Sequence, residues 1–332
     1  IIKIKKSRVI INDSLFPTTL KYFSKFSMAS GSKKIIIAAL IGNALISITK
    51  FIAASMTGSS AMLSEGIHSV VDTGNQILLL YGLKRAAQPA SPQFPFGHGK
   101  EIYLWSFVVA ILIFAVGAGV SIYEGIYHIR HPSALHDPTI NYIVLGLAMI
   151  FEGGALYFAL KEFNKVRGSY SYVEAVQRGK DPSMFVVLFE DCAAMLGLFV
   201  ALAGIILAQI TGNSLWDGVA SVIIGLILAF TAAWLAHETK GLLIGEAANK
   251  DIVEGIHKIA SKQESIEKIN EVLTLHMGPE FILVNMSISF KGHLPVGNIE
   301  KAIEIITKNI KEEFPIAKKV FIEAEPAKLE PN

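Results

Sequence analysis

Six apolar segments, each long enough to cross a membrane, constrain this chain more than any other feature. A transmembrane helix needs about 20 apolar residues, and the segments lie near residues 35–56, 60–83, 102–129, 139–162, 183–210 and 216–239. Charged residues make up 17% of the chain, with a mean hydropathy of +0.48, whereas soluble domains contain about 25% charged residues. The sequence therefore predicts an integral membrane protein, with six transmembrane helices in a domain at residues 31–242.

Basic residues mark one side of this predicted membrane domain. They gather before the first segment and in the connections that follow the second and fourth segments. They are Lys33, Lys34, Lys84, Arg85, Lys100, Lys161, Lys165, Arg167, Arg178 and Lys180. The other three connections, at residues 57–59, 130–139 and 211–215, hold one Arg and no Lys. Because basic loops stay in the cytoplasm, we expect both termini there, with the plasma or inner membrane of a prokaryote as the host membrane.

Residues 246–326 are polar enough to form a soluble domain. Their pattern predicts a helix, two strands, a second helix and a third strand, at residues 251–261, 266–277, 281–290, 298–314 and 319–323. Apolar residues alternate in the second strand at Val284, Met286 and Ile288, which is typical of a strand with one buried face. The expected fold is an all-α membrane domain of six transmembrane helices followed by a small α+β (αββαβ) cytoplasmic domain.

Residues 1–30 form a basic extension, whose first 27 residues hold six Lys or Arg and a single acid, Asp13. This stretch is too charged to span a bilayer, and we expect it to be poorly ordered. Binding to an anionic membrane surface and a role as an organellar transit peptide are the alternatives. The net charge of +2 gives no reason to expect a nucleic-acid partner.

The second apolar segment is the most polar of the six. At about 100° per residue, Glu65, His68, Ser69, Asp72 and Gln76 fall within one third of the helix circumference. His68 and Asp72 are four residues apart and therefore neighbours on that face. An imidazole and a carboxylate at this spacing suit a divalent metal ion, although a hydrogen-bonded pair that only fixes helix packing is the alternative. Ionisable groups inside a membrane favour the functional reading.

The fifth segment supplies the expected partners. Glu190 and Asp191 are adjacent acids inside an otherwise apolar run. If Asp191 faces His68 and Asp72, the site has three protein ligands and room for a fourth. Glu190 points about 100° away on an ideal helix, so it either reaches the site with its longer side chain or accepts a proton beside it.

Two further residues are candidates for accessory roles. Glu152 lies inside the fourth segment and is either part of a proton path or half of a structural pair. His98 lies in the loop after the second segment, within Phe-Gly-His-Gly-Lys-Glu (96–101). Taken alone, His98 is typical of a turn residue.

These residues together resemble the cation diffusion facilitator family over residues 28–326 of this chain. The resemblance rests on Glu-Gly-Ile-His-Ser-Val-Val-Asp (65–72), the 96–101 loop, Ile-Tyr-Glu-Gly-Ile (122–126), the acid on the fifth segment and the αββαβ tail. The residues around Asp72 and Asp191 are most similar to the branch that includes the ninth human zinc transporter.

The resemblance implies a homodimeric antiporter that exports a divalent metal from the cytoplasm while protons enter, and that dimerises through its cytoplasmic domain. It implies a four-ligand site with two ligands from each of the second and fifth helices, and His98 as a ligand on the access path. His68, Asp72 and Asp191 match three of these ligands. Val187 occupies the fourth position and cannot bind metal, so Glu190 is the expected replacement. No prosthetic group is implied, because the metal is the substrate.

Competition between metal and protons for the same groups makes such a site suitable for antiport, since metal binds neutral imidazole and ionised carboxylate. Zinc is the expected metal, and manganese, iron(II) and cobalt are alternatives for a site rich in carboxylates. Two other functions stay open. The first is a metal sensor or scaffold that does not transport. The second is an intramembrane aspartyl protease built on Asp72 and Asp191, and this second function would leave His68 unexplained.

Overall fold

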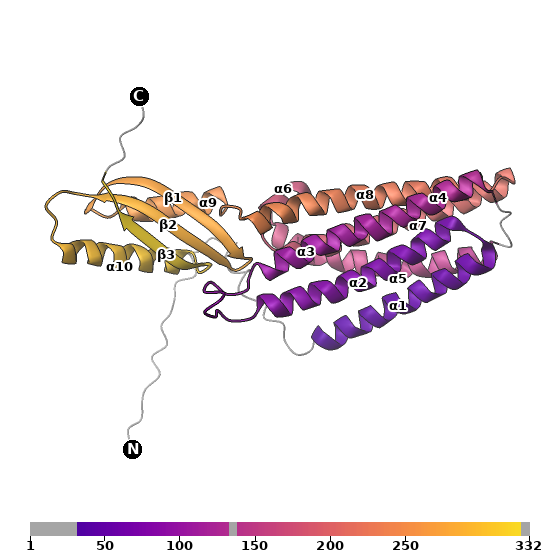
Figure 1. Cartoon of the computed structure of the whole chain (residues 1–332), viewed down its shortest axis with the longest axis horizontal. Coiled ribbons are helices and arrows are strands. Elements are labelled where there is room, and N and C mark those ends of the chain that lie inside the picture. The colour runs from indigo at the N-terminus through magenta and orange to yellow at the C-terminus, as the bar shows by residue number, and fades with distance from the viewer. Residues whose placement is uncertain (1–31, 133–137, 327–332) are drawn as a thin grey trace, which may run out of the picture.

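A bundle of long helices and a small mixed domain make up the fold, seen end to end in Figure 1. The structure, a computed structural model, describes residues 32–132 and 138–326; the predicted basic extension at residues 1–30 lies outside them. Helical structure covers all six predicted segments. The elements are α1 (Ser32–Thr57), α2 (Ser60–Ala86), α3 (Glu101–Leu112), the π-helical η2 (Ile113–Ala118), α4 (Gly119–Arg130), α5 (Thr139–Arg167), α7 (Pro182–Thr211) and α8 (Leu215–Ile244).

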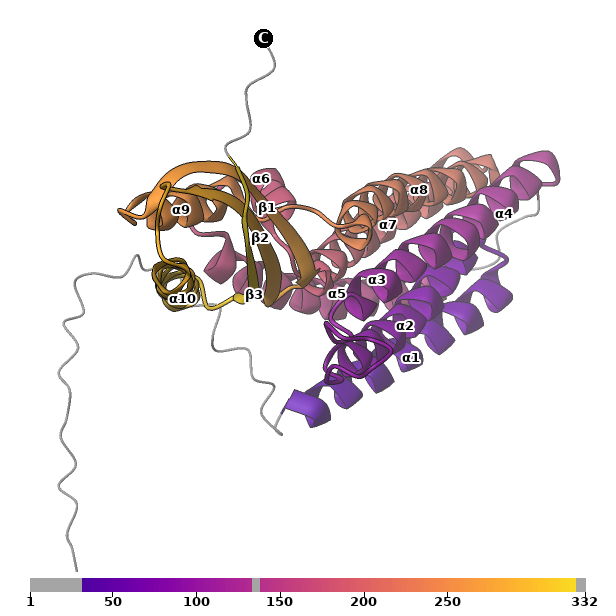
Figure 2. The same cartoon turned by 60° about the vertical axis from the view of Figure 1, so that its left-hand side comes forward.

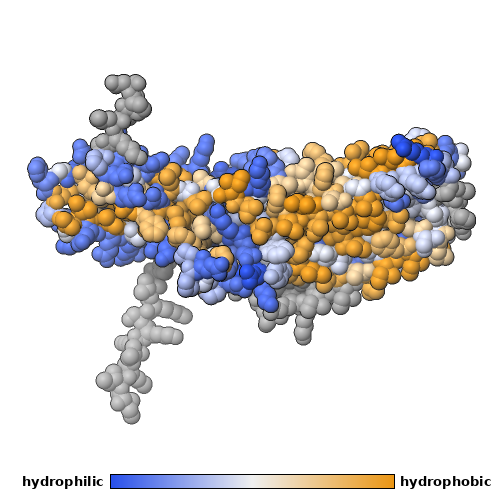
Figure 3. All heavy atoms as spheres, viewed as in Figure 1, coloured by the Kyte–Doolittle hydropathy of each residue, from blue (hydrophilic) through white to orange (hydrophobic). Residues whose placement is uncertain are grey.

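The surface of this bundle suits a lipid environment. Four of the described helical stretches are long and apolar enough to cross a membrane: Glu101–Arg130, Thr139–Arg167, Pro182–Thr211 and Leu215–Ile244. Large apolar side chains such as Ile150 and Phe230 are 71% exposed. Figure 3 shows an apolar surface over the middle of the bundle and hydrophilic residues at its far tip and toward the soluble domain.

Two elements were not predicted. A short helix, α6 (Tyr172–Arg178), lies between α5 and α7, where the Ser171 hydroxyl caps its start by accepting a hydrogen bond from the Glu174 backbone N–H at 3.2 Å. The third span changes to π-helical geometry at η2. Gly117 lies in this segment and Gly119 follows it, and glycine tolerates such a departure from regular helix. Periodicity alone gives no signal for either element.

The start of α2 is held by a buried carboxylate from α8. Asp217 is fully buried and accepts hydrogen bonds from the Ser59 hydroxyl at 2.5 Å, the Ser60 backbone N–H at 2.5 Å and the Ser60 hydroxyl at 2.9 Å. It also lies 3.3 Å from the Ala61 backbone nitrogen, which donates to it. A carboxylate at a helix N-terminus satisfies backbone N–H groups that have no partner within the helix. Asp217 therefore fixes α2 against α8.

We expect Asp217→Asn to destabilise the protein by about 1–3 kcal/mol, since an amide places N–H donors against the donors of α2. The thermal unfolding midpoint in detergent micelles measures this loss. The control is Glu254→Gln, because Glu254 is an exposed acid of the soluble domain. Equal midpoints for the two variants would show that the Asp217 contacts do not hold α2.

The soluble domain consists of α9 (Lys250–Ser261), β1 (Ile266–Gly278), β2 (Phe281–Phe290), α10 (Val296–Glu313) and β3 (Ala317–Ala324), in the expected element order. The central strand β2 pairs antiparallel with β1 and parallel with β3. Alternate residues of β2 are buried with Ile256 of α9 and Ile306 of α10. Figure 2 shows these two helices together beside the sheet.

The soluble domain contacts the bundle through a close backbone approach. The Gly99 Cα, in the loop between α2 and α3, lies 3.0 Å from where a Cβ on Gly278 would stand, so a side chain at Gly278 would crowd that backbone. A side chain on Gly99 would collide with the Met277 carbonyl oxygen. Ion pairs join Lys180 to Glu246 and Arg178 to Asp251 near this joint.

His276 of β1 lies buried beside this joint, with 2% of its surface exposed. Its Nδ1 is 3.4 Å from the Gly278 carbonyl oxygen, and its Nε2 has no hydrogen-bond partner within residues 32–132 and 138–326. Burial lowers the pKa of His276 to about 4, against an ordinary value of 6.5. The unfolded chain therefore takes up a proton at a higher pH than the folded chain does.

We expect the stability supplied by neutral His276 to be complete above pH 6.5 and to fall as the pH drops toward about 4. Between pH 7.5 and pH 5 the free energy of unfolding should fall by about 2 kcal/mol, because each pH unit below 6.5 costs about 1.4 kcal/mol. Hydrogen–deuterium exchange of β1 and β2 peptides measures it. His276→Gln should lose this pH dependence, while His257→Gln, at an exposed position, should keep it; the same profile in both variants would contradict the assignment.

Candidate metal centre

Much of the polar stripe on α2 faces the interior of the bundle. Glu65, His68 and Ser69 are buried, and the Asp72 side chain is 13% exposed. The His68 Nδ1 lies 3.2 Å from Asp72 Oδ1. Neither ring nitrogen of His68 has a well-oriented hydrogen bond to any described residue, and Asp72 Oδ1 has none either. Buried polar atoms without hydrogen bonds are costly, so this pair suits a site that binds a further ligand.

Glu190 also faces α2. The angle of about 100° between neighbouring residues on an ideal helix did not decide whether its side chain would do so. Its carboxylate is buried and accepts a hydrogen bond from Asn75 Nδ2 at 2.7 Å. Asn75 lies three residues after Asp72 and seven after His68, on the same side of α2. The hydrogen bond aims the Glu190 carboxylate at the helix that carries the predicted metal pair. Asn75 was not among the predicted site residues, although its position on the helix is close to that of His68.

Asp191 and Glu152 complete an acidic environment around the pair. Asp191 of α7 is half-buried and lies close enough to Glu152, Asp72 and His68 to interact with their charges. Glu152 of α5 is buried and interacts with the charges of Asp72 and His68. The structure therefore gathers Glu152, an accessory candidate, near the predicted ligands of α2 and α7.

The sequence analysis missed a lysine in this cluster. Lys50 of α1 is fully buried, and its ammonium lies 3.1 Å from Glu65 Oε2 and 2.8 Å from the Ser69 hydroxyl. A lysine inside the first apolar segment is the signal that would have found it, because charged residues within membrane spans are rare and functional. Only the fold shows that Lys50 meets α2 at this level.

The predicted ligands lie near one another but do not surround a single point where a metal ion could bind. Across the described ranges, no three His, Cys, Asp or Glu side chains converge tightly enough to hold a metal ion together. Val187, at the position of the missing ligand, packs among apolar residues. The metal ligands His68, Asp72, Asp191 and Glu190 thus stay a prediction.

The structure does not bring His98 to this cluster. Its ring contacts the Phe94 ring in a tilted arrangement, 47° between planes and 4.5 Å between centroids, and its Nδ1 is 3.7 Å from Glu101 Oε1. Glu101 also accepts hydrogen bonds from Arg85 and Trp105. His98 therefore belongs to the loop that touches the soluble domain, at the opposite end of α2 from Ser59.

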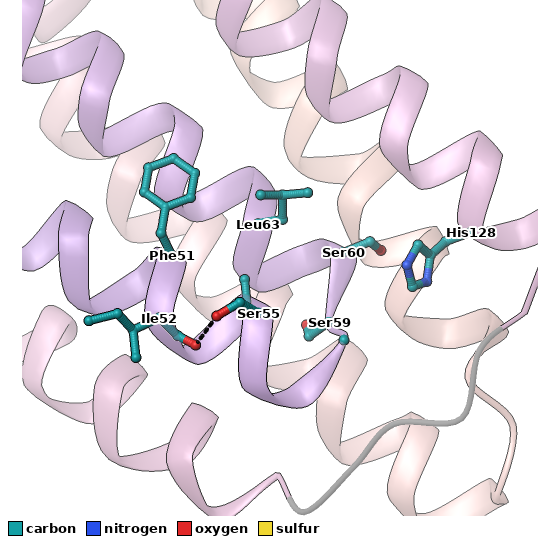
Figure 4. Close-up of a pocket in the computed structure, with 9 residues that line it drawn as sticks. Phe51, Ile52, Ser55, Ser59, Ser60, Leu63 and His128 are labelled. Atoms are coloured by element: carbon teal, nitrogen blue, oxygen red, sulfur yellow. Dashed lines mark hydrogen bonds between the residues drawn. The ribbon is translucent and has the colours of Figure 1, made fainter.

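A cavity of about 530 Å³ lies near that far end of α2, between α1, α2 and α4 (Figure 4). Ser59 and Ser60 line it together with His128 and the apolar side chains of Phe51 and Leu63. None of the predicted metal ligands is among its lining residues. The His68–Asp72 pair therefore lies outside this cavity.

Comparison with known families matches both halves of the fold. A sequence model described as the cation efflux transmembrane domain matches residues 36–244. A second one, described as the cytoplasmic domain of cation efflux proteins, matches residues 248–327. The chain belongs to the cation efflux family. It is therefore an integral membrane protein, and the predicted family is confirmed.

Individual relatives agree with the predicted branch. A mitochondrial proton-coupled zinc antiporter of Xenopus laevis is 32% identical over 286 residues, which cover 85% of this chain and 51% of that protein. The antiporter of the same name from Homo sapiens is 31% identical over 80% of this chain and 47% of its own length. Metal tolerance protein C4 of Arabidopsis thaliana is 28% identical over 81% of this chain and 60% of that protein. The chain spans about half the length of the two antiporters.

Replacing Glu190 tests whether it substitutes for the ligand absent at Val187. We expect Glu190→Gln to weaken zinc binding at least tenfold, because the amide removes an ionised ligand. Adding Val187→Asp to that variant should restore part of the affinity, since residue 187 lies one helical turn before Asp191. Isothermal titration calorimetry in detergent measures both. Glu162→Gln is the control, because Glu162 is exposed; unchanged affinity in Glu190→Gln would remove Glu190 from the site.

Proposed function

We propose that this protein moves a divalent metal cation, zinc, out of the cytoplasm in exchange for protons. The observation that carries the proposal is the buried His68–Asp72 pair on α2, 3.2 Å apart, with acids from α5 and α7 around it. Membership of the cation efflux family agrees with this role. The relatives named as proton-coupled zinc antiporters extend the argument to the metal and to the protons.

The chemistry of these side chains couples the two ions. A metal ion needs neutral imidazole and ionised carboxylates, so metal and protons exclude one another from the same groups. An imidazole changes charge within the physiological pH range. A site that loads metal on one side of the membrane and protons on the other therefore exchanges one for the other.

The topology that fits this function has six transmembrane helices, both termini in the cytoplasm and a homodimer formed through the soluble domain. The basic residues in the connections support this orientation, and the model of the cytoplasmic domain in this family matches the soluble part. The host membrane stays a prediction: relatives carry mitochondrial names, whereas the sequence alone led us to expect a prokaryotic plasma or inner membrane.

Zinc is the proposed metal because of the relatives and because one imidazole with carboxylates suits it. Manganese, iron(II) and cobalt are the alternatives for so many oxygen ligands. A metal sensor that binds without transport is the alternative function. An intramembrane protease is not proposed, since its two acids would leave His68 without a role.

Flux in proteoliposomes under an imposed pH gradient tests the proposal. We expect zinc uptake to drive counter-movement of protons, and we expect Asp72→Ala or Asp191→Ala to lower zinc flux at least a hundredfold, since each change removes a charged ligand. His68→Ala should lower both zinc flux and the protons moved per zinc. A pH-sensitive dye and a zinc-sensitive dye inside the vesicles measure the two ions together.

The exposed acid Glu162 again supplies the control variant, Glu162→Gln. A panel of zinc, manganese, iron(II), cobalt and cadmium fixes the selectivity. Equilibrium zinc binding without flux in the wild-type protein would favour the sensor. Undiminished flux in Asp72→Ala would refute the site.

A further inference from the structure

Lys50 is a fully buried cation inside a domain proposed to carry cations. Its side chain has 0% exposure, as does that of Glu65, its partner on α2. The ammonium donates to Glu65 Oε2 at 3.1 Å and to the Ser69 hydroxyl at 2.8 Å. These contacts bring α1 into the polar centre, although the ligands that we predict come from α2 and α7.

Stability does not explain this pair well. Taking two charges out of water costs about as much as their attraction returns, so apolar side chains of similar volume often serve equally well in such positions. The second carboxylate oxygen of Glu65, Oε1, is buried and has no hydrogen-bond partner within the described parts of the chain. It lies directly against Gly197 of α7, where a Cβ would take up the space that it fills. Glu65 thus keeps an unused ligand atom at the interface of α2 and α7.

The pair lies directly beside the proposed metal centre. Glu65 is one helical turn before His68, and Ser69 is adjacent to His68 in the chain. The charges of both Lys50 and Glu65 act on His68 and on Glu152. A metal ion bound at His68 therefore feels attraction from Glu65 and repulsion from Lys50, and in this low-dielectric interior both are strong.

We propose that Lys50 is a tethered cation that competes with the transported metal for Glu65. The inference rests on the proposed function. The ammonium of Lys50 keeps the Glu65 carboxylate occupied and adds repulsion, so the metal is held by the remaining ligands only. Without Lys50, Glu65 becomes a free anion beside the metal and binding tightens.

The competition between Lys50 and the metal for Glu65 helps the transported metal ion to leave its site. A transporter needs a site that the metal can leave, and a centre surrounded by acids from three helices risks holding a divalent ion too firmly. A fixed positive charge lowers affinity without removing a ligand. Lys50 is therefore a positioning residue that acts on the metal through Glu65.

The experiment uses the full chain in detergent for equilibrium zinc binding and in proteoliposomes for flux. We expect Lys50→Met to lower the Kd for zinc at least tenfold and to lower both KM and kcat of transport, because metal release slows. Glu65→Gln should raise the Kd at least tenfold, since Lys50 then repels the metal without a paired anion. The double variant Lys50→Met with Glu65→Gln should return the Kd to within about threefold of the wild-type value.

Lys165→Met is the matched control, because the Lys165 side chain is 52% exposed and the variant should keep the wild-type Kd. Thermal unfolding shows which variants are folded; if Lys50→Met is not, the opposite shift in Glu65→Gln and its reversal in the double variant carry the test. An unchanged or raised Kd in folded Lys50→Met, or equal Kd values for Lys50→Met and the double variant, would overturn the inference. If the wild-type protein transports zinc and one of these two binding results is found, the inference about Lys50 fails while the proposed function stands. If Lys50→Met binds zinc more tightly but the wild-type protein transports none, only the proposed function fails.

Discussion

Charged and polar groups buried inside an apolar helical bundle determine how its helices can pack against one another. Lipid and apolar side chains offer such groups no partner, and several of those on α2 find one on another helix. Glu65 pairs with Lys50 of α1, Asn75 with Glu190 of α7, and the serines at the start of α2 with Asp217 of α8. The arrangement of α2 among its neighbours follows from these contacts.

Much of this architecture is readable from the sequence, because helix length, apolar content and strand alternation are local properties. The helical segments, the element order of the soluble domain and the contact between His68 and Asp72 agree with the sequence-based expectations, whereas the metal-binding role of that pair stays a prediction. Lys50 and Asn75 were missed because their roles depend on which residue of one helix meets which residue of another. The π-helical segment and α6 depend on local backbone choices that a hydropathy pattern does not report.

Val187, where the family resemblance predicts a missing ligand, has apolar surroundings in the packed bundle. Val187 lies among apolar side chains, while the next acid along the helix, Glu190, turns toward α2 and is held by Asn75. Ionised carboxylates repel one another at short range, and among the described residues no three His, Cys, Asp or Glu side chains converge tightly enough to hold a metal ion together.

The contact between Gly99 and Gly278 gives this chain a mechanical property. With no side chain between the two backbones, the loop joining α2 to α3 and the turn joining β1 to β2 touch without a compressible layer. Side chains can absorb small shifts by changing rotamer, whereas backbone against backbone cannot. A tilt of the ends of α2 and α3 nearest the soluble domain would therefore either move the sheet with it or separate the two surfaces, so the soluble domain is mechanically coupled to the helix that carries His68 and Asp72.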